Sequence, residues 1–393
     1  MAQVRRLSEG ESEEGDLIWL QAFERGNLDR LPSLRSFRDQ FNYRIVRFGL
    51  WDSEGMQATF EMMNTQLNFG PAMLLPSTYI SSIACKPASR GRGYGGAGLI
   101  HMLSDMRDSG KVLTTLCPAN YDYYRQFGWE WINSRRLYRV PTAALESSPE
   151  TQFVRAMRPN DKPAVEAVYA TFASRYRGMS VRDEAEWDYL LGDRPSSVSY
   201  TYVYVREGAV EGYVVVREGS SEETFLPEFL ALTSRAHRGL LGLLRTLQMQ
   251  TKVFKWDAPE DDTLWSVCFH REIETSIRPV MQGRVVDVTR ALSALQPTDG
   301  LVGECVISVQ DPCVPWNQGR FQVCVYGGRA EVYASTKEAD VEMDIQAFTQ
   351  AYFGVLSVTQ LRHRERITVA SDAAFAILER LFAGPPMWNN GAF

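Results

Sequence analysis

The feature that most constrains this fold is an internal repeat. Residues 4–23 (VRRLSEGESEEGDLIWLQAF) and residues 153–172 (FVRAMRPNDKPAVEAVYATF) each combine a short strand pattern, an acidic helix start and an amphipathic helix that ends on phenylalanine. A second pair follows deeper in the chain: residues 87–103 (PASRGRGYGGAGLIHML) and 233–247 (TSRAHRGLLGLLRTL) each predict a basic, glycine-containing turn that opens a helix. Repeats at this spacing predict two related domains.

The region between the two repeats predicts an α/β unit. Apolar and β-branched runs bounded by turn residues predict strands at 44–51, 57–69, 79–86 and 112–118. Helical spacing predicts an amphipathic helix over 98–106, with an apolar face made by Leu99, Met102, Leu103 and Met106. The order is strand, glycine-rich turn, helix and strand, which is typical of α/β folds.

The second half predicts a hairpin and then a third domain. Residues 200–219 alternate as two strands around a turn at Glu207-Gly208. From residue 284 the pattern changes to strands at 303–311 and 321–328, followed by helices at 344–354 and 371–384. We therefore expect three α/β or α+β domains, with the bounds 1–150, 151–283 and 284–393.

Composition excludes several classes of protein. The chain has 393 residues and a net charge of −6, which disfavours a nucleic-acid-binding surface because such a surface needs a basic face. It has no apolar run of 18 residues and no apolar leader at its start, so we expect a cytoplasmic protein without a membrane partner. The six cysteines and four histidines are scattered without metal-ligand spacing, which predicts reduced thiols and no metal.

The sharpest motif is ACKPASRGRGYGGAG at residues 84–98, between a predicted strand and a predicted helix. Its spacing Arg90-x-x-Gly93-x-Gly95 resembles the pyrophosphate loop of the GCN5-related N-acetyltransferases. Glycines let backbone amides approach an anion closely, a helix N-terminus attracts it, and arginines grip phosphate oxygens. The alternatives are a solvated basic turn or a dinucleotide-binding loop, but no acidic residue follows at the distance that the latter requires.

The second copy of this motif lacks two features of the first. Ala236 stands where the first copy has a basic residue, and Leu241 stands where the first copy has its last glycine. Lost charge and added bulk disfavour phosphate binding there. We therefore expect one cofactor site per chain, in the first domain.

A tyrosine cluster in ANYDYYRQFGWEW, residues 119–131, offers a general acid. A tyrosine with a pKa of about 10 can protonate a departing thiolate whose thiol has a pKa of about 8.5. Tyr121 and Tyr123 fit a role as aromatic wall equally well. Tyr124, directly before RQFG, is the preferred acid.

The end of the chain, GPPMWNNGAF, is unusually apolar for a terminus and predicts a docked tail. Together with SIACKPASRGRG, YYRQFGW, the degenerate second copy, RVVDV and PWNQGRF, it makes the chain resemble the enhanced-intracellular-survival (Eis) branch of these acetyltransferases over essentially its full length. The resemblance implies two tandem acetyltransferase (GNAT) domains, the second without cofactor, and a C-terminal sterol-carrier-like domain.

The resemblance also implies a set of site residues. Tyr124 is the implied general acid, and the carboxylate of Phe393 is the implied general base. The implied acetyl-CoA contacts are Ile83, Ala84, Cys85, Arg90, Gly91, Arg92, Gly93, Tyr94, Gly95, Gly96, Ala119 and Asn120. The loop departs from the arginine- and leucine-rich family pattern, which puts its outer contacts in doubt.

The implied activity is direct acetyl transfer from acetyl-CoA, without a metal, to primary amines of aminoglycosides or polyamines, by a homo-oligomer, a hexamer in the family. Two alternatives stay open. One is a lysine acetyltransferase that acts on peptides or proteins. The other is a lipid carrier without catalysis, which predicts an apolar tunnel among residues 300–383.

Overall fold

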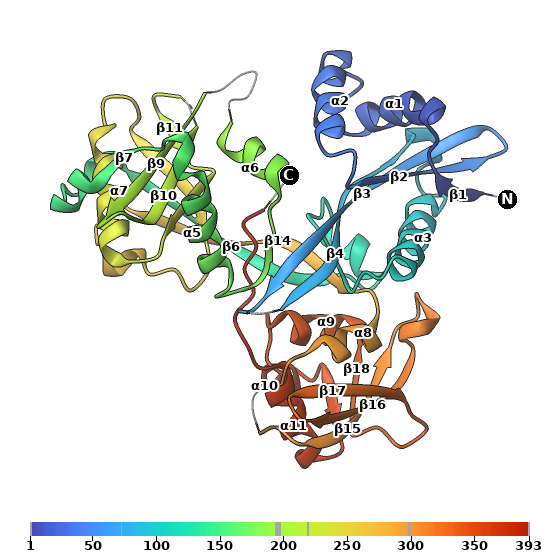
Figure 1. Ribbon diagram of the computed structural model, residues 1–393. Coiled ribbons are helices and arrows are strands. Elements are labelled where there is room, and N and C mark those ends of the chain that lie inside the picture. Colours follow the sequence, from blue (N-terminus) through green and yellow to red (C-terminus); the bar gives the residue numbers. More distant parts are fainter. Residues whose placement is uncertain (1, 72, 193–197, 218–219, 298–299, 392–393) are drawn as a thin grey trace.

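The computed structural model describes the chain apart from residues 1, 72, 193–197, 218–219, 298–299 and 392–393. The described parts form three lobes (Figure 1), and each lobe contains both strands and helices. The predicted mixed α/β class is confirmed. The domain bounds at 150 and 283 stay a prediction, because one sheet continues through both of the first two lobes.

The first lobe is built on long antiparallel strands with helices on both faces. Ile18 of α1 packs on Met56 and Ala84, whereas Leu99 of α3 packs with Phe60 and other residues in a separate cluster. The elements are β1 (Gln3–Arg6), α1 (Ser12–Phe23), α2 (Leu31–Gln40), β2 (Ile45–Asp52), β3 (Gly55–Phe69), β4 (Leu74–Cys85), α3 (Tyr94–Asp108), β5 (Leu113–Leu116), α4 (Tyr121–Arg125) and β6 (Glu130–Pro141).

The helix predicted over 98–106 is confirmed as part of α3. Leu99, Met102, Leu103 and Met106, the four residues of the predicted apolar face, are all fully buried. The face therefore packs on the sheet as the 3.6-residue periodicity requires.

The second lobe repeats the start of the first. A strand, a 3₁₀ turn and a twelve-residue helix occur in the same order in both lobes, so the first predicted repeat is confirmed. The elements are β7 (Val154–Ala156), α5 (Lys162–Ala173), β8 (Arg177–Ser180), α6 (Glu184–Leu191), β9 (Ser199–Arg206), β10 (Ala209–Arg217), β11 (Glu223–Phe225), β12 (Glu228–Ala231), α7 (Ser234–Thr246), β13 (Val253–Ala258) and β14 (Glu274–Val285).

The predicted hairpin is β9–β10. Its turn lies at Glu207 and Gly208, which both have positive φ, 51° and 82°. Two consecutive positive φ values match the turn type that suits the twist of a tight hairpin.

The first two lobes are joined by a shared sheet. Its strand order is β1-β2-β3-β4-β5-β14-β6-β13-β11, with β8 added on β3. Strand β14 lies between β5 and β6 and pairs antiparallel with both. The segment just before residue 284 therefore belongs to the sheet of the first lobe, a position that the sequence does not indicate.

The third lobe is a five-stranded sheet, order β17-β16-β15-β18-β19, with helices against it. Its interior is filled by the buried aromatic side chains of Phe348, Tyr352, Phe353 and Phe382. The elements are α8 (Val288–Ala294), β15 (Gly303–Gln310), β16 (Gly319–Tyr326), β17 (Arg329–Ala334), β18 (Val341–Asp344), α9 (Ile345–Phe353), α10 (Val358–His363), β19 (Ile367–Val369) and α11 (Asp372–Phe382).

After α11 the chain leaves the third lobe and runs up between the other two (Figure 1). Within the described ranges no helix is long and apolar enough to cross a membrane.

Candidate active site

The centre of the site is the place where β4 and β5 separate. These parallel strands pair from Ser77↔Leu113 to Ile80↔Leu116. Strand β4 then continues to Cys85, paired on its other edge with β3, while the chain after β5 leads into α4. Beyond Ile80 the described ladder between β4 and β5 ends. We call the edge of β4 that faces β5 there the β4–β5 opening, because its backbone groups can pair with an extended ligand.

Backbone direction along β4 supplies polar groups to this opening. The amide of Lys86 bonds to Gln57 O at 2.9 Å, and Ala84 lies opposite Thr59 in the same register. Because hydrogen-bonded positions alternate along an antiparallel pair, the amides and carbonyls of Ile83 and Cys85 point to the β5 side. The backbone groups of the predicted contacts Ile83 and Cys85 therefore lie at this edge, whereas those of Ala84 point to β3.

The glycine-rich loop follows at once. Gly91 and Gly93 have φ values of +79° and +80°, and Gly93 is the residue before the first turn of α3. An added Cβ at either position meets open space, so backbone conformation and not crowding calls for glycine there. The start of this 15-residue helix therefore lies beside open space, and a helix start attracts anions.

The side chains around the loop differ in exposure and in their contacts with Asp52. Arg90 and Arg92 are exposed, and Arg92 lies 4.0 Å from Asp52. Tyr94 donates a hydrogen bond to Asp52 at 2.8 Å. The predicted contact at Tyr94 is thus limited to its backbone, whereas both arginines stay available to phosphate oxygens.

Gly95 and Gly96 have a packing role that the sequence did not indicate. A Cβ at Gly95 would overlap the hydroxyl of Tyr123, and one at Gly96 would lie 2.5 Å from the Phe127 ring. These two glycines bring the first turn of α3 against the aromatic segment. The helix N-terminus and the tyrosine cluster are therefore adjacent.

Tyr124 lies on α4, which begins after Asn120. The Asn120 side chain caps this helix by accepting from the amide of Tyr123 at 3.1 Å, so its predicted cofactor contact competes with a capping role. Tyr124 packs against Tyr123, with ring centroids 5.2 Å apart. Burial raises the pKa of Tyr124 above its ordinary value and that of Tyr123 to about 12. Both phenols are therefore protonated at neutral pH.

The tail after α11 is docked as its apolar composition predicts. It runs beside β8, where the amide of Trp388 bonds to Arg177 O at 2.8 Å and the amide of Arg177 bonds to Pro386 O at 2.9 Å. Trp388 is 1% exposed and belongs to a core cluster of the second lobe. The tail thus forms an isolated parallel bridge with β8 and docks on the second lobe.

The last described residues of the tail are held by β6. Asn133 donates to Asn389 O at 2.9 Å, and Arg135 donates to Gly391 O at 3.0 Å. Gly391 also lines a small cavity with Tyr79 and Thr115, one pair before the ladder of β4 and β5 ends. Phe393, the predicted base, lies outside the described residues.

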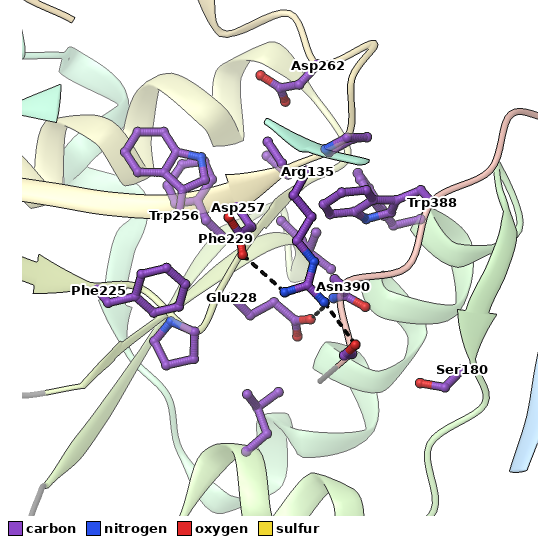
Figure 2. Close-up of a pocket in the computed structure, with 18 of the residues that line it drawn as sticks. Arg135, Ser180, Phe225, Glu228, Phe229, Trp256, Asp257, Asp262, Trp388 and Asn390 are labelled. Carbon is purple, nitrogen blue, oxygen red and sulfur yellow. Dashed lines mark hydrogen bonds and ion pairs between the residues drawn. The ribbon is translucent and has the colours of Figure 1, made fainter. Parts of the chain in front are cut away.

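A larger cavity of about 290 Å³ lies on the other side of the tail (Figure 2). Its aromatic walls include Phe225, Phe229, Trp256 and Trp388, and its lining carries one more carboxylate than guanidinium groups. Arg135 spans it, with bonds to Gly391 O and to Asp257 at 3.2 Å. None of the predicted site residues that the structure describes lines this cavity.

The second lobe has no counterpart of the glycine loop, and one prediction about it is wrong. Arg238 and Gly239 do not form a turn that opens a helix, because α7 already begins at Ser234, capped by Thr233. Gly239 lies inside α7, where an added Cβ would sit 2.7 Å from the Tyr204 ring. The glycine serves helix packing, and the described segment lacks the positive-φ loop of the first lobe.

Comparisons with known proteins agree with this division. Residues 3–132 match the model of an acetyltransferase (GNAT) domain, residues 178–285 match another GNAT domain model, and residues 288–390 match a sterol carrier protein domain. Fold and site together define the chain as an N-acetyltransferase of the GNAT class, an acyltransferase enzyme.

Within that class the chain is an Eis-like homologue, with two GNAT domains and a C-terminal sterol-carrier-like domain. It is 24% identical to N-acetyltransferase Eis of Mycobacterium tuberculosis over 355 residues, 86% of each chain. It is 25% identical over 338 residues to an uncharacterized N-acetyltransferase of Streptomyces avermitilis, covering 81% of this chain and 82% of the relative.

Solved structures share the fold over their full length. Eis1 from Mycobacterium abscessus superposes with a TM-score of 0.77 at 22% identity. A GCN5-related N-acetyltransferase from Anabaena variabilis superposes with a TM-score of 0.88 at 18% identity. Both cover 100% of this chain and of their own. The predicted family and three-part architecture are confirmed.

Proposed function

We propose that the chain transfers the acetyl group of acetyl-CoA directly to a primary amine of a small polyamine or aminoglycoside-like acceptor. The observation that carries this proposal is the opening between β4 and β5, which lies beside a loop with positive φ at Gly91 and Gly93. Acetyltransferases of this class use acetyl-CoA as the acyl donor. Acetyl-CoA has an extended arm that leads to a pyrophosphate. The arm fits the β4–β5 opening, and the pyrophosphate fits the start of α3, because a helix N-terminus binds anions.

The residues around the opening have distinct proposed roles. The amides from Gly91 to Gly96 hold the pyrophosphate, with Arg90 and Arg92 beside them. The backbone of Ile83, Ala84 and Cys85 guides the rest of the donor, with Ala119 and Asn120 on the far side. The amide of Cys85, or of a neighbour, polarises the acetyl carbonyl as it gains negative charge.

Tyr124 is the proposed general acid. Its raised pKa keeps it protonated across the neutral range, and a thiolate leaving group is basic enough to take the proton. Its neighbour Tyr123 abuts the start of α3, where an added Cβ at Gly95 would overlap its hydroxyl. The acid therefore lies on a segment that touches both the start of α3 and the core below it.

The carboxylate of Phe393 is the proposed general base. An ammonium group cannot attack a thioester, so a proton must first be removed from the acceptor. Support comes from the docked tail, which Asn133 and Arg135 hold two to four residues before this carboxylate. Desolvation raises the pKa of a carboxyl group, as a base in this role requires.

The cavity beside the tail is the proposed acceptor site. Its aromatic walls suit the rings or methylene chains of an amine, and their faces can attract a cation. The lining also includes the carboxylate of Asp262, whereas the other three lining carboxylates, Glu186, Glu228 and Asp257, pair with arginines. The relatives named Eis are N-acetyltransferases, and the aminoglycoside acceptor and the hexameric assembly are proposals by resemblance. Sedimentation velocity tests the hexamer.

Two alternatives differ in their predictions. A lysine acetyltransferase would acetylate lysine peptides better than polyamines. A lipid carrier would not consume acetyl-CoA, and the closely packed aromatic interior of the third lobe argues against a carrier. A thiol-release assay with acetyl-CoA against aminoglycosides, polyamines and lysine peptides separates all three.

A variant of the proposed general acid tests the mechanism. Tyr124→Phe is expected to lower kcat by about 10²-fold or more while leaving acetyl-CoA binding intact. An unchanged kcat would assign the acid to another group.

A further inference from the structure

Three consecutive backbone carbonyls after Tyr124 are bonded by side chains from the third lobe and from strand β14. Gln346 on α9 donates to Arg125 O at 3.0 Å. The thiol of Cys313 donates to Gln126 O at 3.3 Å. Arg284 on β14 donates to Phe127 O at 2.5 Å. The end of a helix leaves its last carbonyls without helical partners. Arg125 O also accepts from the amide of Gly128 at 3.0 Å, so Gln346 adds a second hydrogen bond there. Cys313 and Arg284 bond carbonyls that lie beyond the last residue of α4.

The strongest of these donors sits in a socket built by the third lobe. Arg284 and Asp311 are both fully buried and form an ion pair at 2.5 Å. Asn317 donates to the same Asp311 oxygen at 3.2 Å, and the Asp311 amide bonds to Gln318 Oε1 at 2.7 Å. The segment PWNQ of the third lobe thus holds Asp311 in place, and the Asp311 carboxylate in turn holds Arg284.

The segment after Tyr124 is shaped to receive this guanidinium. Gly128 has φ +87°, and a Cβ there would overlap Nη1 of Arg284. The guanidinium also lies over the Trp129 ring, 5.5 Å from its centroid. Phe127 and Trp129 in turn donate their amides to Tyr124 O at 3.0 and 3.3 Å. A continuous set of bonds therefore runs from Asp311 to the backbone of Tyr124.

We infer that the sterol-carrier-like domain is a positioning element for the general acid. Its residues Gln346 and Cys313, with the Arg284–Asp311 pair, fix the carbonyl end of α4 and so fix the phenol of Tyr124 over the β4–β5 opening. This inference rests on the proposed role of Tyr124. A general acid must lie within hydrogen-bond reach of its target, and a shift of about 1 Å can cost about 10²-fold in rate.

The test removes a donor without disturbing the buried ion pair. Gln346 is only half-buried, so Gln346→Met keeps its size and deletes the hydrogen bond to Arg125 O. We expect kcat to fall about fivefold, the rate equivalent of a typical hydrogen bond, with KM for acetyl-CoA unchanged. Gln346→Lys, which keeps a donor, is expected to restore kcat.

Gln322→Met is the matched control. Gln322 is also a half-buried glutamine of the third lobe, but it bonds to Glu304 within that lobe. It is expected to leave kcat unchanged. Equal losses of kcat in Gln322→Met and Gln346→Met would overturn the inference, because they would indicate a general loss of stability.

The decisive arm combines Gln346→Met and Cys313→Ala with Tyr124→Phe. If the third lobe acts through Tyr124, these substitutions lower kcat in the parent enzyme and have no further effect once the phenol is gone. The same proportional loss in both backgrounds would overturn the positioning role while Tyr124 stays the acid. A Tyr124→Phe enzyme with unchanged kcat would instead refute the proposed acid and this inference with it.

Discussion

Replacing Gly128 with alanine tests how the segment after Tyr124 packs against Arg284 and the third lobe. Gly128 has φ +87°, a conformation that costs an alanine about 1–2 kcal/mol. Its new Cβ would also overlap Arg284 Nη1 and lie 2.7 Å from Cζ and 2.9 Å from Ile345 Cγ2. The guanidinium must therefore move away from Phe127 O and Asp311.

The loss of the Arg284–Asp311 ion pair costs more than the backbone strain at position 128. Asp311 is fully buried, and a buried carboxylate that loses its partner costs about 3–5 kcal/mol. We expect Gly128→Ala to lower the free energy of unfolding by about 4–7 kcal/mol, the sum of strain and lost pairing. This is a large part of the total stability of an ordinary domain.

Gly110→Ala is the matched control. Gly110 also has positive φ, +78°, but an added Cβ there meets nothing within 4 Å. Gly110→Ala should lower the free energy of unfolding only by the strain of the positive φ, about 1–2 kcal/mol. Urea unfolding followed by tryptophan fluorescence measures both, since Trp129 lies next to Arg284. Equal losses in the two variants would refute the claim that Arg284 occupies the space beside Gly128.

Three further predictions address the active site and its support. Burial raises the pKa of Tyr124 above about 10, so its proton is lost only as pH rises through that higher value. We therefore expect kcat to show no alkaline decline from this group below pH ~10. A decline below pH ~9 that disappears in Tyr124→Phe would contradict this. Deletion of Phe393 should lower kcat and spare acetyl-CoA binding, and full turnover in a thiol-release assay would reject the tail carboxylate as base. Gly98→Ala should destabilise the protein by about 1–3 kcal/mol, because the new Cβ would lie 2.6 Å from Phe60 Cδ1. The same change in an exposed helix would stabilise by about 1 kcal/mol. A rise in melting temperature would contradict this prediction.

The parts of the fold that depend on neighbouring residues could be predicted from the sequence. The strand, glycine turn and helix around residues 84–98 appear as β4, the loop and α3 because each is specified by local signals. Positive φ at Gly91 and Gly93 agrees with the phosphate-loop interpretation. The turn at Glu207 and Gly208 was predictable for the same reason.

Pairings between distant segments could not be predicted. Strand β14 carries a proline and charged residues and shows no alternation, and its pairing with β5 joins residues more than 160 positions apart. The socket of Arg284 depends on that pairing. One signal was present: glycine at position 128, which follows the tyrosine segment, marks a place where another group approaches the backbone closely.

The second glycine motif misled for a physical reason. Arg238-Gly239 resembles Arg92-Gly93 in sequence, but Thr233 caps the helix five residues before Arg238, so the same dipeptide falls inside α7. Cap residues, and not the dipeptide, decide where a helix begins.

The central claim is that one chain holds one acetyl-CoA, in the first lobe. Isothermal titration of acetyl-CoA should give one site per chain, with binding weakened strongly by Arg92→Ala together with Gly93→Val and left unchanged by Arg238→Ala. Two sites per chain, or binding that survives the changes at Arg92 and Gly93 and is lost with Arg238, would contradict the account.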